Sequence, residues 1–143
     1  MVKEHPLDNG VRDWQQETAD MAARFGVADR VDYLPWGDIV PVAQRARGMV
    51  TVNSTSGTLG LAMGVPVVAL GHAVYDIPDI TNQDGLDAFW QNPVAPDEAT
   101  FAAFRRVLVE RCLIPGGFFS EEAIAKVVRH AVARFEGKAL LPE

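Results

Sequence analysis

The fold of this chain is decided by residues 49–70, which read MVTVNSTSGTLGLAMGVPVVAL. Two apolar segments rich in β-branched residues, 49–52 and 66–70, enclose a polar turn and a short helical segment that ends at Gly64. Strands without polar alternation are typical of parallel sheets covered on both faces. The stretch therefore predicts a strand, a helix and a parallel strand.

The same alternation extends in both directions along the chain. A first strand is expected before the turn at Asp8-Asn9-Gly10, and a second over 31–34. Further elements are expected as follows: a helix from an Asp13 cap to Gly26, a helix capped by Asp38, an irregular segment over 75–96, a helix over 97–112, and a helix after a Ser120 cap. Their apolar spacing predicts buried faces formed by Trp14, Met21, Ala22, Phe25, Phe101, Phe104, Val107, Leu108, Ile124, Val127, Val128, Ala131 and Phe135.

This order predicts an α/β fold, a three-layer, doubly wound, mainly parallel sheet of the Rossmann-like kind, as one domain over residues 1–143. The 19 acidic and 13 basic side chains argue against nucleic acid or an anionic membrane as partner. With Cys112 as its single cysteine, the chain has no internal disulfide and no zinc-ligand spacing, so we expect no metal and a cytoplasmic location. The uncharged run 48–75 is broken by polar residues and Pro66, so no transmembrane segment is expected, and the start lacks the apolar region of a signal peptide.

The first candidate site is Lys3-x-His5-Pro6, at the carboxyl end of the first expected strand. Ligands of open α/β sheets bind at that edge. Alternation along a strand puts Lys3 and His5 on one side, where both can face an anion. An ordinary surface lysine and histidine remain an equally good interpretation.

The second candidate is the turn made of Asn53, Ser54, Thr55, Ser56 and Gly57. Backbone N–H groups at a helix start, with small hydroxyl side chains beside them, can bind a phosphate without any net positive charge. The turn lacks the glycine spacing of a P-loop and of a dinucleotide-binding fold. Helix capping alone explains these residue types equally well.

The third candidate is the segment after residue 75, where Asp76, Gln83 and Asp87 lie among aromatic side chains and could contact a sugar or a base. Solvated carboxylates in a loop are the favoured alternative. No carboxylate is nominated as a catalytic base, and Asp8, like Asp76 and Asp87, suits ligand contact or loop structure.

Taken together, the Lys3-x-His5-Pro6 motif and the segments 52–57, 64–71, 75–78 and 85–90 resemble the bacterial capsule polysaccharide biosynthesis and export proteins, over nearly residues 2 to 119. The resemblance implies the carboxyl-terminal, donor-binding half of a GT-B glycosyltransferase that transfers Kdo from CMP-Kdo during synthesis of the capsule linker. The acceptor domain would precede residue 1, so the isolated chain is expected to bind CMP or CMP-Kdo weakly and to transfer nothing.

In related transferases a His-Pro motif and a Ser/Thr motif hold the CMP phosphate, which assigns that role to His5, Pro6, Ser54 and Thr55. His5 would then stabilise charge on the leaving phosphate, with no metal or other cofactor. A capsule glycolipid acceptor, the export machinery and a peripheral place at the inner membrane are implied as context. Two alternatives stay open: a non-catalytic capsule export or assembly module, and an epimerase-like binder of sugar phosphates.

Overall fold

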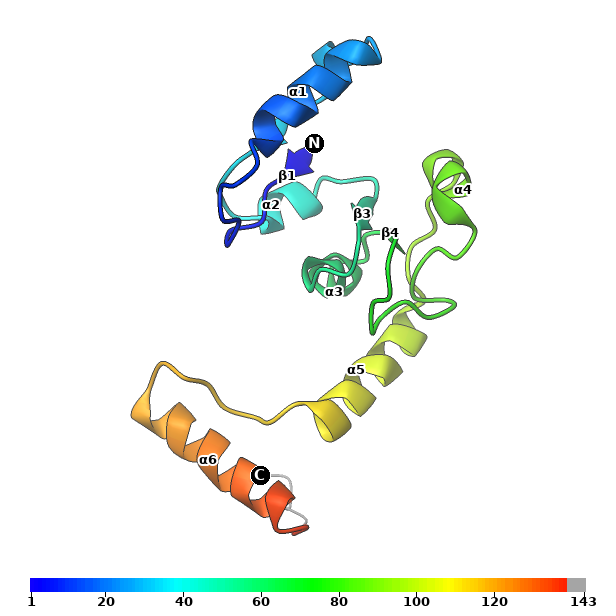
Figure 1. Ribbon diagram of the computed structural model, residues 1–143. Helices are drawn as coiled ribbons and strands as arrows, with labels where there is room; N and C mark the ends of the chain where they lie inside the picture. The colour runs from blue at the N-terminus through cyan, green and yellow to red at the C-terminus, as the bar shows by residue number, and fades with distance from the viewer. Residues whose placement is uncertain (139–143) are drawn as a thin grey trace.

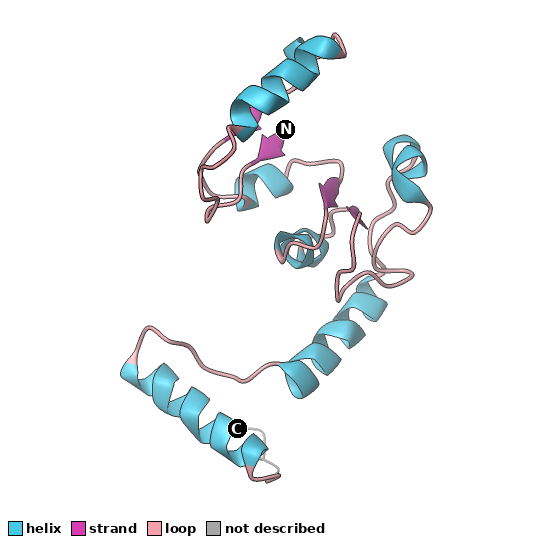
Figure 2. Cartoon of the chain, viewed as in Figure 1, coloured by secondary structure: helices cyan, strands magenta, loops and turns pink. Residues whose placement is uncertain are grey.

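The computed structural model describes residues 1–138, shown in Figures 1 and 2. Helices and short parallel strands alternate through its first half, and two longer helices complete it. The elements are β1 (Val2–Lys3), α1 (Trp14–Arg24), the 3-10 helix η1 (Ala28–Arg30), β2 (Tyr33–Leu34), α2 (Val40–Ala43), β3 (Met49–Thr51), α3 (Ser56–Ala62), β4 (Val67–Ala69), α4 (Gly85–Gln91), α5 (Glu98–Cys112) and α6 (Glu121–Phe135).

The strands form two parallel pairs. β1 pairs with β2, with Val2 opposite Tyr33, and β3 pairs with β4, with Met49 opposite Val67. Parallel pairing with helical connections confirms the α/β class. Among the described residues each pair is a separate two-stranded sheet, and one continuous doubly wound sheet remains a prediction.

The core lies around β3, α3 and β4, the region of the uncharged run. Leu61, Val67, Tyr75, Ile80 and Phe101 form one buried cluster, so the start of α5 belongs to it. Because Val67 and Val68 are both buried although they point to opposite faces of β4, this strand is covered on both sides, as its unbroken apolar sequence predicts.

Helix starts follow the sequence closely. The side chains of Asp13, Asp97 and Ser120 accept hydrogen bonds from the backbone N–H groups of Gln16, Thr100 and Ala123. These bonds confirm the predicted caps of α1 and α6, and they show that Asp97 caps α5 in the same way. The predicted cap at Asp38 is one residue too early: Ile39 is the N-cap of the short α2 and makes no side-chain cap bond, while Asp38 before it accepts from the N–H of Val40 at 2.9 Å.

The segment 75–96 is more ordered than expected, because it contains α4. Phe89 of this helix is buried, and a β-carbon added to Gly48 would lie 2.5 Å from its ring. Asn82 also fixes the segment: its side chain exchanges hydrogen bonds with the backbone of Val94, at 2.9 and 3.0 Å, and donates to the carbonyl of Val67 at 3.2 Å.

The expected burial of the helix faces is wrong at several positions. Apolar spacing identifies the face of a helix that should be covered, but not whether the same chain covers it. In Figure 1, α6 lies away from the strands and α1 lies at the opposite end of the molecule. The exposed fractions are Trp14 40%, Met21 53%, Phe25 68%, Val107 58%, Ile124 44%, Val128 55% and Phe135 92%. Phe104, Leu108, Val127 and Ala131 are half-buried, and Ala22 and Phe101 are buried as expected.

Candidate functional site

The turn from Asn53 to Gly57 leaves the carboxyl end of β3 and leads into α3, as expected. Its shape is set by local hydrogen bonds. The hydroxyl of Thr51 accepts from the N–H of Ser54 at 3.1 Å, and the Ser54 hydroxyl accepts from the N–H of Ser56 at 3.2 Å. The hydroxyls of Ser54 and Ser56 lie 2.7 Å apart. The two serines are therefore held side by side at the end of the strand.

Tyr75 fixes this turn from the core. Its hydroxyl donates to the carbonyl of Ser54 at 2.6 Å, while its ring is 2% exposed. Burial raises the pKa of the Tyr75 hydroxyl, the Thr51 hydroxyl opposes this, and the charge of Asp76 adds to it. The ring lies so close to the turn that a β-carbon at Gly57 would be 2.5 Å from Tyr75 Cζ. The phenol is therefore a neutral donor, and glycine is required beneath it.

The turn leaves donors available to a ligand. Thr55 is exposed, and within residues 1–138 neither its N–H nor its hydroxyl has a hydrogen-bond partner. The same holds for the side-chain amide of Asn53, which is also exposed. Uncharged N–H and hydroxyl donors of this kind suit an anion at a strand end. Asn53 and Thr55 therefore form the open side of the turn, and Ser54 and Ser56 its internal support.

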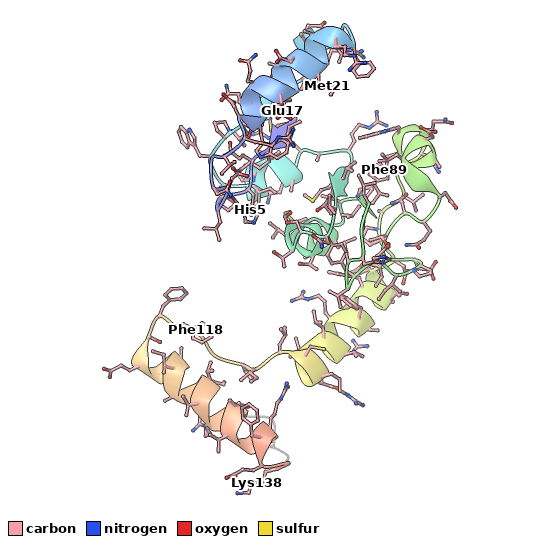
Figure 3. All side chains as sticks on the ribbon, in the orientation of Figure 1. His5, Glu17, Met21, Phe89, Phe118 and Lys138 are labelled. Atoms are coloured by element: carbon pink, nitrogen blue, oxygen red, sulfur yellow. The ribbon has the colours of Figure 1, made fainter. Side chains whose placement is uncertain are left out.

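His5 lies in the turn after β1, as Figure 3 shows, and is exposed. Its Nδ1 accepts from the N–H of Leu7 at 3.1 Å, so in the neutral ring the proton is on Nε2, which can donate to a ligand. Lys3 is half-buried, and its ammonium group donates to the carbonyl of Glu4 at 2.7 Å. Pro6 follows His5 and is exposed. Lys3 uses one of its three ammonium donors in this bond, whereas the Nε2–H of the neutral His5 ring is engaged by no described residue.

A tyrosine on the neighbouring strand supports this end of β1. The hydroxyl of Tyr33 donates to the carboxylate of Glu4 at 2.7 Å. Desolvation, together with that bond and the charge of Glu4, raises the pKa of Tyr33 to about 12. The pair fixes the backbone immediately before His5, and sequence reasoning missed it because the partners lie 29 residues apart.

The His5 turn and the Ser54 turn belong to different strand pairs. No hydrogen bond joins them in the described part of the chain. Each turn keeps the local geometry expected of a strand end. That the two turns bind one ligand together remains a prediction, because they follow strands of two separate sheets.

Asp76 and Gln83 lie together, but their hydrogen bonds hold the loop in place and do not leave them as an open ligand site. The Gln83 amide donates to Asp76 Oδ1 at 3.0 Å and to the Thr81 hydroxyl at 2.8 Å, and Thr81, which is 5% exposed, donates to the same Asp76 oxygen at 2.8 Å. Asp87 lies exposed in the first turn of α4 and takes no part in this cluster. Asp8 accepts from Gly10 N–H and Trp14 Nε1, a loop role. The sequence analysis missed Thr81, because a threonine in a polar loop gives no indication that it is buried and hydrogen-bonded.

Two further findings concern residues 1–138. No group of three or more His, Cys, Asp or Glu side chains is arranged to hold a metal ion. No helix in this range combines the length and apolar character that crossing a bilayer requires.

Comparison with known proteins defines the class to which these features belong. The family described as "Capsule polysaccharide biosynthesis protein" matches residues 1–119. The chain belongs to this family, which confirms the resemblance found in the sequence.

Among its relatives is "Capsule polysaccharide modification protein LipB" of Neisseria meningitidis serogroup A, 38% identical over 122 residues, which are 85% of this chain and 29% of LipB. "Capsule polysaccharide export protein KpsS" of Escherichia coli is 29% identical over 119 residues, 83% of this chain and 31% of KpsS. The chain thus spans less than a third of the length of these relatives. No solved structure matches it.

Proposed function

We propose that this chain binds the activated sugar donor used in capsule polysaccharide synthesis, and that the donor is CMP-Kdo. The family supports the capsule context, and the resemblance of its motifs supports the choice of CMP-Kdo. The observation that carries the proposal is the turn after β3, where Tyr75 holds Ser54 by a 2.6 Å bond and Thr55 keeps its N–H and hydroxyl available.

In this proposal the phosphate of CMP lies against the donors of Asn53 and Thr55, at the start of α3. Hydrogen bonds from preorganised N–H and hydroxyl groups stabilise an anion without a lysine, which accounts for binding by a chain of net charge −6. His5 supplies a further donor from Nε2. The run 48–75 that contains the turn has no Asp, Glu, Lys or Arg, so the proposed binding rests on these uncharged donors and on His5.

The proposed chemistry is a displacement at the anomeric carbon of the sugar. The bond from this carbon to the phosphate oxygen breaks, and its electron pair leaves with CMP while an acceptor hydroxyl forms the new bond. The donors of the turn and His5 stabilise the charge that develops on the phosphate. The acceptor hydroxyl must also lose a proton to a base, and Asp8 and Asp76 are both engaged in loop structure. We therefore expect donor binding without transfer by this chain alone.

Titration calorimetry with CMP, UMP and CMP-Kdo tests the proposal. The wild type should bind CMP and CMP-Kdo, and His5→Ala and Thr55→Pro should each weaken binding, since the second removes an N–H donor. His130→Ala, in α6, is the matched control and should bind as the wild type does. Absence of binding by the folded wild type, or equal binding by all variants, refutes the proposal.

A second candidate function is a non-catalytic module for capsule export or assembly. The observation that favours it is the name of the relative KpsS, a capsule polysaccharide export protein. Retention of export partners in a pull-down with the His5→Ala, Ser54→Ala double variant, together with no nucleotide binding by the wild type, would select this candidate.

A further inference from the structure

A second strand ends beside the proposed phosphate turn. β3 and β4 are parallel neighbours, with Thr51 opposite Ala69 at the end of their ladder, and both lie beside α3 in Figure 1. The carboxyl ends of parallel strands meet at one edge of the sheet, where the ligands of open α/β folds bind. The turn 53–57 leaves β3 at this edge, and the segment 70–76 leaves β4 there. Residues of this second segment are therefore neighbours of the proposed site.

Backbone contacts continue beyond the ladder and bring the two segments together. The N–H of Leu70 donates to the carbonyl of Thr51 at 2.8 Å, and the N–H of Gly71 donates to the carbonyl of Val52 at 2.9 Å. A β-carbon added to Gly71 would lie 2.9 Å from Val52 Cγ1 and 3.1 Å from the Val52 carbonyl oxygen. Val52 is followed directly by Asn53, the first residue of the turn. The chain after β4 therefore stays beside the chain after β3 up to the turn itself.

His72 is the next residue along this segment. Gly71 lies about one strand spacing, roughly 4.8 Å, from the chain of β3, and His72 is one residue beyond it. The side chain of His72 is exposed, and within residues 1–138 its ring takes part in no hydrogen bond or ion pair. An imidazole nitrogen is therefore available to a ligand at the edge where Asn53 and Thr55 also keep free donors.

His72 is also the one side chain of the run 48–75 that can carry a positive charge. The run contains no Lys or Arg, and His72 is its single histidine. Tyr75 uses its hydroxyl to donate to the carbonyl of Ser54. Asp76, the carboxylate nearest to His72 in the sequence, accepts from Thr81 and Gln83 through Oδ1. The ring of His72 is therefore not paired with the acidic group of its own segment.

The sheet topology distinguishes His72 from His5. His5 follows β1, which belongs to the other strand pair, whereas His72 follows β4 of the same pair as the turn. The register of β3 and β4 places His72 next to the turn without any assumption about how the two sheets are arranged. His72 is therefore the histidine that the observed pairing itself assigns to this edge.

We propose that His72 is a binding residue for the phosphate of CMP and donates a hydrogen bond from its ring to the anion held by Asn53 and Thr55. This inference rests on the proposed function and adds a third group to the same site. A protonated imidazole also contributes a positive charge, and hydrogen bonds between charged groups are about twice as strong as neutral ones. His72 thus supplies the charge that the turn itself lacks.

Titration calorimetry with CMP on two pairs of variants tests this role. His72→Ala should weaken CMP binding by roughly three- to tenfold, the effect of losing one hydrogen bond to an anion. His72→Arg keeps N–H donors and a permanent positive charge, so it should bind CMP at least as tightly as the wild type. His130→Ala and His130→Arg make the same two changes in α6, away from the strands in Figure 1, and should both bind as the wild type does.

NMR of the His72 ring protons in the wild type gives a second measurement, which needs no variant. These resonances should shift as CMP is added. If His72→Ala binds CMP as tightly as the wild type while Thr55→Pro binds it more weakly, the role of His72 is refuted and the proposed function stands. Equal gains in His72→Arg and His130→Arg would likewise refute it, because a general effect of charge would then suffice. A folded wild type that binds no CMP refutes both proposals.

Discussion

Replacing Gly57 with alanine tests the packing that shapes the proposed phosphate turn. The added β-carbon would lie 2.5 Å from Tyr75 Cζ and 2.8 Å from Cε2, whereas ordinary contacts begin near 3.4 Å. Tyr75 is 2% exposed and cannot turn toward solvent without opening the core. The ring must therefore shift by about 1 Å, and its bond to the Ser54 carbonyl is strained or lost.

The expected cost follows from two effects. Overpacking a well-filled core costs about 1 to 3 kcal/mol, and loss of one hydrogen bond costs about 1 kcal/mol. The Ser54 carbonyl also accepts from the N–H of Gly57 at 2.9 Å, so it is not left without a partner. We expect the free energy of unfolding to fall by about 2 to 4 kcal/mol in urea denaturation.

Two variants control this measurement. At Gly117 a new β-carbon meets its nearest neighbour at 3.6 Å, so Gly117→Ala should change the free energy of unfolding by less than about 0.5 kcal/mol. Tyr75→Phe removes the hydroxyl nearest Gly57, so Gly57→Ala should cost less in that background. A loss below about 0.5 kcal/mol in the wild-type background would refute the close packing of Tyr75 on this turn. Equal losses in both backgrounds would show that the clash is with the ring carbons and that the hydroxyl and its bond contribute nothing to the cost.

Three further predictions concern other contacts. Burial raises the pKa of Tyr75, so above about pH 10 the folded state keeps the phenol proton that the unfolded chain loses. The free energy of unfolding should therefore fall as pH rises above about 10, and it should fall less steeply in Tyr75→Phe. Identical slopes of unfolding free energy against pH in the two proteins would contradict this. Hydrogen bonds from Thr100 lower the pKa of Asp97, so stability should fall as pH drops below about 4, a dependence that Asp97→Asn should remove while keeping the helix cap. Removing the carboxylate with Glu4→Gln should lower the pKa of Tyr33 from about 12 in an ultraviolet titration, although not fully to 10.0, since desolvation remains; an unchanged pKa would argue against the Glu4 bond.

The sequence was most informative where local chemistry determines the structure. The apolar segments around residues 49–70 predicted two parallel strands and a helix, and Asp13 and Ser120 were correctly assigned as caps. α4 was missed because a helix of 7 residues is too short to show a period. Its Phe89 is fixed by packing on Gly48, a contact across 41 positions that spacing cannot reveal.

The sequence identified which residues form the candidate site, but not the more distant residues that hold the site in shape. The Ser54 turn could be recognised from its position between a strand and a helix. Two hydroxyl groups fix it: that of Thr51 accepts from the N–H of Ser54, and that of Tyr75, 21 residues away, donates to the carbonyl of Ser54. The burial of Val128 and Phe135 was wrong because an amphipathic pattern does not say which chain covers the face.

Amide NMR during titration with CMP tests the central proposal most directly. We expect the largest shift changes at Thr55 and its neighbours in 53–57, with a change at the His5 ring, and smaller effects with UMP. Resonances of α1 and α6 should not move. No change at Thr55 under conditions where the chain is folded, or changes confined to α1 or α6, would contradict donor binding at the turn after β3.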